Sequence, residues 1–258
     1  VFQILRIMEP RRSDLLDDAL CPADVSNGGW SLRGKAAVVF DRVETNGSFV
    51  LHQLIKRALL WSNGSVIFLA LSRPFVHYDR ILRKLGCNLI AYANSKRFVF
   101  FDLRNSNFPD DFDNGLPALY RKLQNTVNQF PKNLKEDLTI VIDDLSLLEV
   151  AANGSTNSIL NFLHYTRSIG CTLLVLIHED IYDSTEKSTL LFKLDYLADI
   201  LIKVDHLATG LATDVHGQLT IMNRGIITSD GSIDTKISNF QFKVKENNVE
   251  YFYPGCRT

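Results

Sequence analysis

Residues 38–59, VVFDRVETNGSFVLHQLIKRAL, join an apolar strand pattern to an amphipathic helix pattern through a short loop. The loop ends in Asn46-Gly47-Ser48, and the stretch after it carries apolar residues at helical spacing: Val50, Leu51, Leu54, Ile55 and Ala58. A strand, a glycine-containing loop and a helix N-terminus form the arrangement in which nucleotide-binding proteins hold phosphate groups. The stretch therefore predicts an α/β fold and poses the question of whether the loop binds a nucleotide.

The loop lacks most of the residues that a working phosphate site requires. A loop of the form GxxxxGK[ST] uses glycines to bring backbone N–H groups together, a lysine to supply charge and a hydroxyl to hold magnesium. Aligned on Gly47, this chain has Arg42 at the first glycine, Ser48 at the lysine and Phe49 at the hydroxyl. A bare helix N-terminus contributes only about 0.3–1 kcal/mol to anion binding. The sequence therefore predicts a degenerate phosphate loop.

Two further stretches test this interpretation. The apolar run TIVIDDLSLL, residues 139–148, ends in Asp143 and Asp144, at the position where an aspartate orients magnesium in this class of fold. The alternative is that these residues cap the next element or pair with a neighbouring side chain. The run 65–71 ends in Ser72-Arg73, where RecA-type ATPases have a carboxylate that polarises water. We expect no catalytic residue, with Gly47, Ser48 and Asp143 marking a degenerate nucleotide site.

The rest of the chain alternates strand and helix patterns from Lys35 onward. Strands are predicted at residues 36–40, 65–71, 88–92, 97–103, 138–145, 171–180 and 199–207, and helices at 47–61, 77–86, 116–130, 153–168 and 189–198. Two C-terminal stretches, 217–225 and 238–255, predict antiparallel strands with a turn at Asn247-Asn248. The fold class is therefore α/β, a mostly parallel central sheet flanked by helices with a C-terminal antiparallel extension. Residues 1–34 are interpreted as an N-terminal arm with a short helix in 13–20, and 35–258 as one domain.

Composition limits the function classes. Hydrophobic residues make up 46% of the 258, and 28 Lys and Arg oppose 29 Asp and Glu, for a formal charge of −1. A near-neutral chain is not a strong polyanion binder by itself, so any basic groove needs a local patch or partner subunits. Cys87 and Cys171 begin apolar runs and are expected as buried free thiols. The six histidines show no paired-ligand spacing, so no metal site is expected.

The segment His178-Glu179-Asp180 is polar at the end of a buried strand. It is interpreted as the point where the strand meets solvent, with ligand sensing at a subunit interface as the alternative. No apolar run approaches the roughly 18 residues of a membrane span, and no signal peptide is recognised. A reducing compartment, the cytoplasm or the nucleus, is therefore expected.

Several segments together resemble the family of sixth subunits of the Elongator complex. They are DRVETNGSFVLHQLIKRAL (41–59), VIFLALSRPFVHYDRILRKLGCNL (66–89), VIDDLSLLE (141–149), ILNFLHYTRS (159–168) and HLATGLATDVHGQLTI (206–221). The resemblance implies a RecA-like fold without a functional phosphate loop, in a hexameric ring with the fourth and fifth subunits. It further implies that the remaining Elongator subunits and tRNA are partners, that wobble-uridine modification is the process served, and that no cofactor is needed.

Candidate contact residues follow from charge and position. The cations near the ends of predicted elements are the candidates for tRNA binding: Arg80, Arg83, Lys84, Arg167 and Arg224. The glycine-containing stretch 206–221 is the candidate subunit interface, represented by Gly210, Asp214 and His216, with a plain hairpin connection as the alternative. Two other functions stay open: a weak or composite ATPase that shares a nucleotide site with a neighbour, and a scaffold that makes no nucleic-acid contact.

Overall fold

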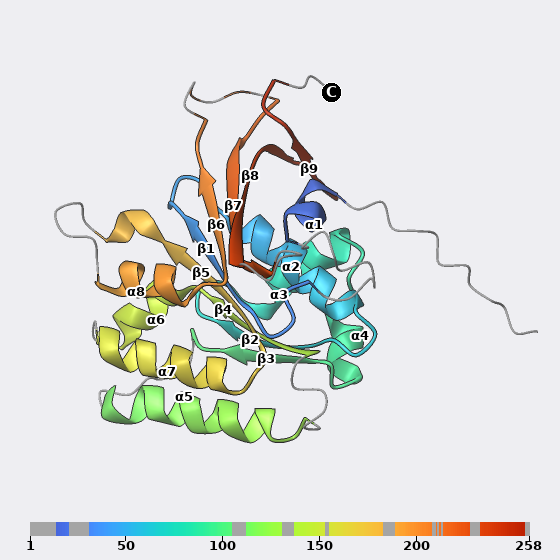
Figure 1. Cartoon of the computed structure of the whole chain (residues 1–258). Coiled ribbons are helices and arrows are strands. Elements are labelled where there is room, and N and C mark those ends of the chain that lie inside the picture. Colours follow the sequence, from blue (N-terminus) through green and yellow to red (C-terminus); the bar gives the residue numbers. More distant parts are fainter. Residues whose placement is uncertain are drawn as a thin grey trace, which may run out of the picture.

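A nine-stranded sheet lies between two layers of helices in the part of the chain that the computed structural model describes (Figure 1). The described residues are 14–20, 31–104, 112–130, 137–152, 155–182, 189–207, 210, 212, 214–227 and 233–255. The strands are β1 (Ala36–Asp41), β2 (Ser65–Ala70), β3 (Phe98–Asp102), β4 (Leu138–Asp143), β5 (Thr172–His178), β6 (Ile200–Asp205), β7 (Gly217–Ile227), β8 (Ile233–Val244) and β9 (Val249–Phe252). The helices are α1 (Leu15–Leu20), α2 (Ser48–Leu60), α3 (Phe75–Lys84), α4 (Leu89–Asn94), α5 (Phe112–Val127), α6 (Leu145–Ala151), α7 (Thr156–Ser168), the short η2 (Glu179–Ile181) and α8 (Thr189–Leu197).

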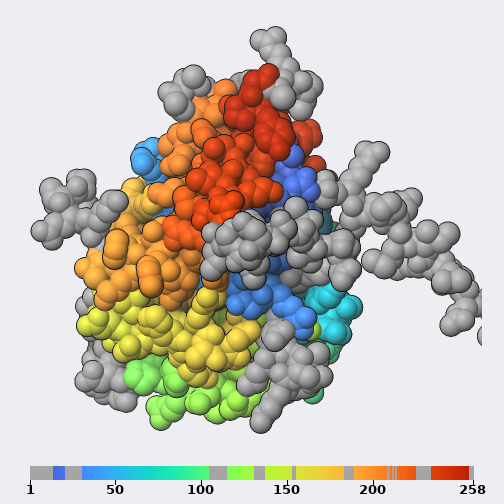
Figure 2. Space-filling model, viewed as in Figure 1, coloured from blue at the N-terminus to red at the C-terminus, as the bar shows by residue number. Residues whose placement is uncertain are grey.

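The strand order confirms the predicted mixed sheet. It runs β3-β2-β4-β5-β1-β6-β7-β8-β9, with the first six of these strands parallel to one another and the last three added antiparallel. Parallel strands need crossover connections, and the helices between them supply these connections. In Figure 2 the orange and red C-terminal strands cover the upper part of the visible face, above the yellow and green helices.

Alternating side chains of the central strands fill two separate cores. In β1, Ala37 and Val39 belong to the core under α1 to α4, whereas Ala36, Val38 and Phe40 belong to the core under α5 to α8. Every residue of β1, β2 and β4 is buried, as a sheet covered on both faces requires. The continuous apolar runs seen in the sequence are therefore explained by two-sided packing.

The structure differs from the sequence prediction in three local elements. Residues 88–92, predicted as a strand, begin helix α4, because the Asn88 side chain accepts a hydrogen bond from Ala91 N and caps that helix. The predicted strand 138–145 ends at Asp143, since Asp144 caps α6. The β8–β9 turn is centred one residue earlier than predicted, because Lys245 N donates to Asn248 O.

Helix α1 packs on the same chain's antiparallel strands. Leu16 and Leu20 are fully buried in the core that contains Phe240. The Asn223 side chain donates to Leu20 O at 3.0 Å, and Arg57 binds the carboxylates of the α1 segment. The short helix expected in 13–20 is thus present, and the boundary at residue 34 stays a prediction.

The cysteine prediction is confirmed for both residues named: Cys87 and Cys171 are buried and free. None of the helices in the described ranges combines the length and the apolar character that crossing a membrane requires.

Candidate functional site

The residues predicted to mark a degenerate nucleotide site lie at the carboxyl edge of the parallel strands. Strands β4, β5 and β1 are neighbours in the sheet and end in Asp143, His178 and Asp41. Ligands of open α/β sheets bind at this edge. The structure brings the three predicted residues, Gly47, Ser48 and Asp143, to this edge, and adds Asp41 and His178.

The anion position of the phosphate loop is filled by the protein's own groups. Gly47 N donates to Asp41 Oδ2 at 2.6 Å, and Ser48 N donates to Asn46 Oδ1 at 2.8 Å. A Cβ on Gly47 would lie 3.0 Å from Asp41 Cβ and 3.1 Å from Val204 Cγ2. The backbone N–H groups that a phosphate would need therefore already bind side-chain oxygens.

His178 joins two of the carboxylates at the point where β5 meets solvent, as predicted, since His178 and Glu179 are half-buried and Asp180 is exposed. Its Nδ1 bonds Asp41 Oδ1, and its Nε2 lies 3.2 Å from Asp144 Oδ2. These hydrogen bonds, to Asp144 and then to Asp41, raise the pKa of His178 to about 10. The imidazolium is therefore an internal counter-ion, and its side chain is only 20% exposed.

The two aspartates at the end of β4 have different structural roles. Asp144 Oδ1 accepts Ser146 N at 2.6 Å and Leu147 N at 3.2 Å, so it is the N-cap of α6. Asp143 Oδ2 accepts the Tyr78 hydroxyl at 2.7 Å, and Ser72 Oγ lies 3.1 Å from that hydroxyl. Burial raises the pKa of Asp143 to about 6, and it also raises the pKa of Tyr78.

The charge of this edge disfavours a polyphosphate. Asp41, Asp143 and Asp144 are each at most 3% exposed, and His178 is the cation that contacts two of them. Like charges at short range in a poorly solvated site repel strongly. Among the described residues, no group of three or more His, Cys, Asp or Glu side chains is arranged to hold a metal ion.

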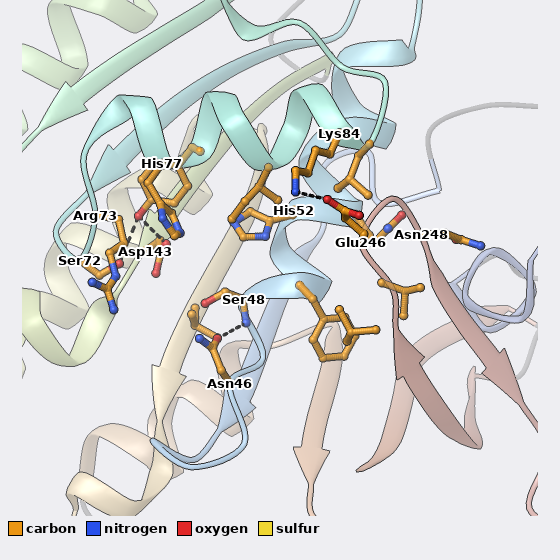
Figure 3. Close-up of a pocket in the computed structure, with 18 of the residues that line it drawn as sticks. Asn46, Ser48, His52, Ser72, Arg73, His77, Lys84, Asp143, Glu246 and Asn248 are labelled. Atoms are coloured by element: carbon orange, nitrogen blue, oxygen red, sulfur yellow. Dashed lines mark hydrogen bonds and ion pairs between the residues drawn. The ribbon is translucent and has the colours of Figure 1, made fainter. Parts of the chain in front are cut away.

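A cavity of about 530 Å³ opens beside this edge (Figure 3). It is lined by α2, α3 and the β8–β9 turn, and Ser48 and Asp143 contribute to its wall. Other lining residues are Phe49, His52, Arg73, His77, Tyr78, Ile81, Lys84, Leu85, Val244, Lys245, Glu246 and Val249. In Figure 3, the ion pair of Lys84 and Glu246, 2.6 Å long, links α3 to the β8–β9 turn.

The predicted tRNA-binding cations fall into two groups. Arg80, Arg83 and Lys84 lie together on exposed positions of α3, and Lys84 lines the cavity. Arg167 and Arg224 lie at the opposite edge of the sheet, where they bind the carboxylates of Asp199 and Asp195 respectively. The first group alone adjoins the candidate site.

The predicted interface residues lie near the amino end of β7. Gly210 is exposed, with a φ of 90° that favours glycine. Asp214 binds Lys243 at 3.0 Å, and His216 Nδ1 accepts Val244 N at 3.1 Å. Asp214 and His216 therefore help to attach the start of β7 to β8.

Sequence reasoning missed the His178 bridge and the cavity because both depend on long-range neighbours. The ends of the two strands were visible in the sequence. Strand β4 ends in an acid and β5 ends in a histidine, and a polar residue follows each of them. Their contact follows only once β5 is placed between β4 and β1.

Comparison with solved structures supports the fold. A KaiC-like protein from the hyperthermophilic archaeon Pyrococcus horikoshii OT3 superposes with a TM-score of 0.61 at 14% identity, covering 95% of this chain and 100% of that one. The mostly parallel sheet with its antiparallel extension is thus a RecA-like fold.

Comparison with curated proteins and family models identifies the relatives. Elongator complex protein 6 of Mus musculus is 28% identical over 239 residues, 82% of this chain and 88% of the relative. The Homo sapiens protein of that name is 28% identical over 248 residues, covering 86% and 91%. The model of the family "Elongation complex protein 6" matches residues 25–246. The chain therefore belongs to this family, that of the sixth Elongator subunit.

Proposed function

We propose that this chain is a non-catalytic subunit of a heterohexameric ring, assembled with the fourth and fifth Elongator subunits. The ring supports tRNA binding for wobble-uridine modification by the remaining subunits. Membership of the Elongator family supports the assignment to that complex. The observation that carries the non-catalytic role is the hydrogen bond from Gly47 N to Asp41 Oδ2, which places a carboxylate where a phosphate would bind.

The binding free energy that this edge can offer a nucleotide favours a structural role over a catalytic one. Nucleotide binding at a phosphate loop depends on a lysine and magnesium together with the backbone. Here the position of that lysine is Ser48, and a helix N-terminus contributes only about 0.3–1 kcal/mol. A bound phosphate would also have to displace the Asp41 carboxylate and would meet the buried Asp143.

Exposed aromatic residues on α8 support association with other subunits. Phe192 is 66% exposed and Tyr196 is 87% exposed, and they lie one helical turn apart. Large apolar side chains gathered on one helix face are typical of surfaces that bind protein.

We further propose that this chain acts in the cytoplasm, and in the nucleus where the complex is present there.

Calorimetric titration with Mg-ATP tests the non-catalytic role. The isolated chain and the complex with the fourth and fifth subunits are both titrated, and assembly is checked by light scattering. We expect no Mg-dependent binding to the chain alone. Tight binding by the chain alone would overturn the proposal. The proposal would also be overturned if the complex hydrolysed ATP and Ser48→Ala abolished that hydrolysis without disturbing assembly. This chain would then contribute to a composite ATPase site.

Crosslinking of tRNA to the assembled complex tests the nucleic-acid part. We expect peptides of this chain among the adducts, in α3 or the neighbouring cavity. Adducts confined to the other subunits would leave this chain as a scaffold.

A further inference from the structure

The cavity contains a buried hydrogen-bonding atom without a partner. His52 is 5% exposed and lines the cavity, and its Nε2 makes no hydrogen bond to any described residue. In Figure 3, His52 lies between Asp143 at one end and the Lys84–Glu246 ion pair at the other. A buried polar atom without a hydrogen-bond partner destabilises the folded state. A ligand with a hydrogen-bonding edge would remove this cost.

His52 is neutral and can therefore serve either as donor or as acceptor. Burial, and then the charge of His77, lower its pKa to about 4. A neutral imidazole nitrogen donates or accepts according to its tautomer. Its best partner is an uncharged polar group.

The remaining walls suit a flat, apolar-faced group. Phe49, Ile81, Leu85 and Val249 line the cavity, and the Phe49 ring packs on Phe242 with centroids 4.5 Å apart. A volume of about 530 Å³ falls in the range of small-molecule sites.

Cations surround the opening. Arg73 and Lys84 line the cavity, and Arg80 lies one helical turn before Lys84 on α3. Lys84 is paired with Glu246, which also lines the cavity. Across the described part of the chain, Arg73 and Arg80 form no ion pair with a carboxylate. Their charge nevertheless reaches the cavity, since burial, then Arg73, then Arg80 lower the pKa of His77.

We propose that this cavity receives the base of one unpaired RNA nucleotide, with the flanking phosphates on Arg73 and Arg80 and the base edge on His52. The inference rests on the proposed tRNA-binding function and names the part of the RNA that this chain holds. Proteins recognise RNA mainly in single strands and loops, whose bases unstack onto aromatic side chains while cations follow the backbone. A base is uncharged and so tolerates Asp143, whereas its phosphates stay at the cationic opening.

Binding of a labelled RNA stem–loop to the complex with the fourth and fifth subunits tests the proposal by fluorescence anisotropy. His52→Phe keeps a flat aromatic ring, slightly larger than imidazole, but removes the hydrogen bond, and we expect it to weaken stem–loop binding roughly five- to thirty-fold. The same variant should keep or raise the melting temperature, because it removes an unsatisfied buried atom. Arg73→Ser with Arg80→Ser should weaken binding further and reduce its salt dependence.

Three controls make the outcomes distinct. Arg121→Ser removes an exposed cation on α5, in the other helix layer, and should leave binding unchanged. A fully paired RNA of equal length should bind the wild type and His52→Phe equally. Uridine monophosphate, as a free nucleotide with the same chemistry, should compete only at far higher concentration than the stem–loop.

The outcomes separate the two proposals. Unchanged stem–loop binding by both cavity variants overturns the cavity inference while leaving tRNA binding by the complex intact. Failure of the wild-type complex to bind RNA overturns the proposed function itself. Equal competition by the free nucleotide and the stem–loop overturns RNA as the source of the base. A 4-thiouridine placed in the loop should crosslink to a peptide of α2 or α3.

Discussion

Replacing Asp143 with asparagine should stabilise the fold. The side chain is 2% exposed, and its Oδ2 accepts the Tyr78 hydroxyl at 2.7 Å. Asparagine retains a carbonyl oxygen for that hydroxyl and carries no charge. The substitution therefore keeps the hydrogen bond and removes the cost of burying a carboxylate.

The magnitude follows from the pKa. Burial raises the pKa of Asp143 from 3.8 to about 6, and one pH unit corresponds to 1.36 kcal/mol. Because the folded pKa lies above the unfolded value, the carboxyl favours the folded state only while it is protonated. The free-energy cost of burying the ionised carboxylate is absent below pH 3.8, grows from there to about pH 6 and is complete above about pH 6. We expect Asp143→Asn to gain about 1–3 kcal/mol at pH 7.5.

Urea unfolding followed by circular dichroism at pH 5 and pH 7.5 measures the effect. The gain should be larger at pH 7.5 than at pH 5. The adjacent Asp144→Asn is the matched control, because it retains the α6 cap but loses the ion pair with His178, and it should lower stability. A loss of stability in Asp143→Asn at pH 7.5, or a gain equal at both pH values, would refute the reasoning.

Three further substitutions test neighbouring contacts. His178→Gln should lose stability relative to wild type at pH 6, and the difference should shrink as the pH rises through about 10, the raised pKa of His178, as read from melting temperatures. Gly47→Ala should cost about 1–3 kcal/mol in urea unfolding, because its Cβ would press on Asp41 and Val204, and an unchanged midpoint would contradict this packing. Arg57→Met should speed proteolysis of the N-terminal segment, since Arg57 is 14% exposed and binds both Asp14 and Asp17, and an unchanged cleavage rate would exclude that role.

The fold was predictable from the sequence because its signals are local and repeated. The runs at β1, β2, β4 and β5 are apolar except for one or two residues each, as two-sided burial demands, and the helix patterns between them predict parallel pairing. Residues 88–92 were mistaken for a strand because β-like composition outweighed one signal, the capping Asn88. Local patterns thus determine most elements, and at residues 88–92 a single cap decides between helix and strand.

The sequence predicts the position of the site and the groups that it lacks, but not the side chains that fill it. The missing lysine at Ser48 is visible in the sequence, but the residue that occupies the phosphate position is not. Asp41 bonds Gly47 within one loop, whereas the contact between His178 and Asp41 spans 137 positions of the chain. The cavity likewise needs the contact between Lys84 and Glu246, 162 positions apart. Such contacts depend on strand order, which periodicity does not encode.

The contacts of Asp41 are the physical reason why we expect this edge not to bind a nucleotide. Burial raises the pKa of Asp41 despite its bonds to His178 and Gly47, so this carboxylate is held at a cost that only its internal partners reduce. A phosphate entering the loop would have to take the Gly47 N–H from Asp41 and would leave that carboxylate beside Asp144 with one partner fewer. Restoring a lysine at Ser48 would not by itself free the Gly47 N–H from Asp41. We therefore expect the Asp41 carboxylate, together with the missing lysine, to oppose phosphate binding in this loop.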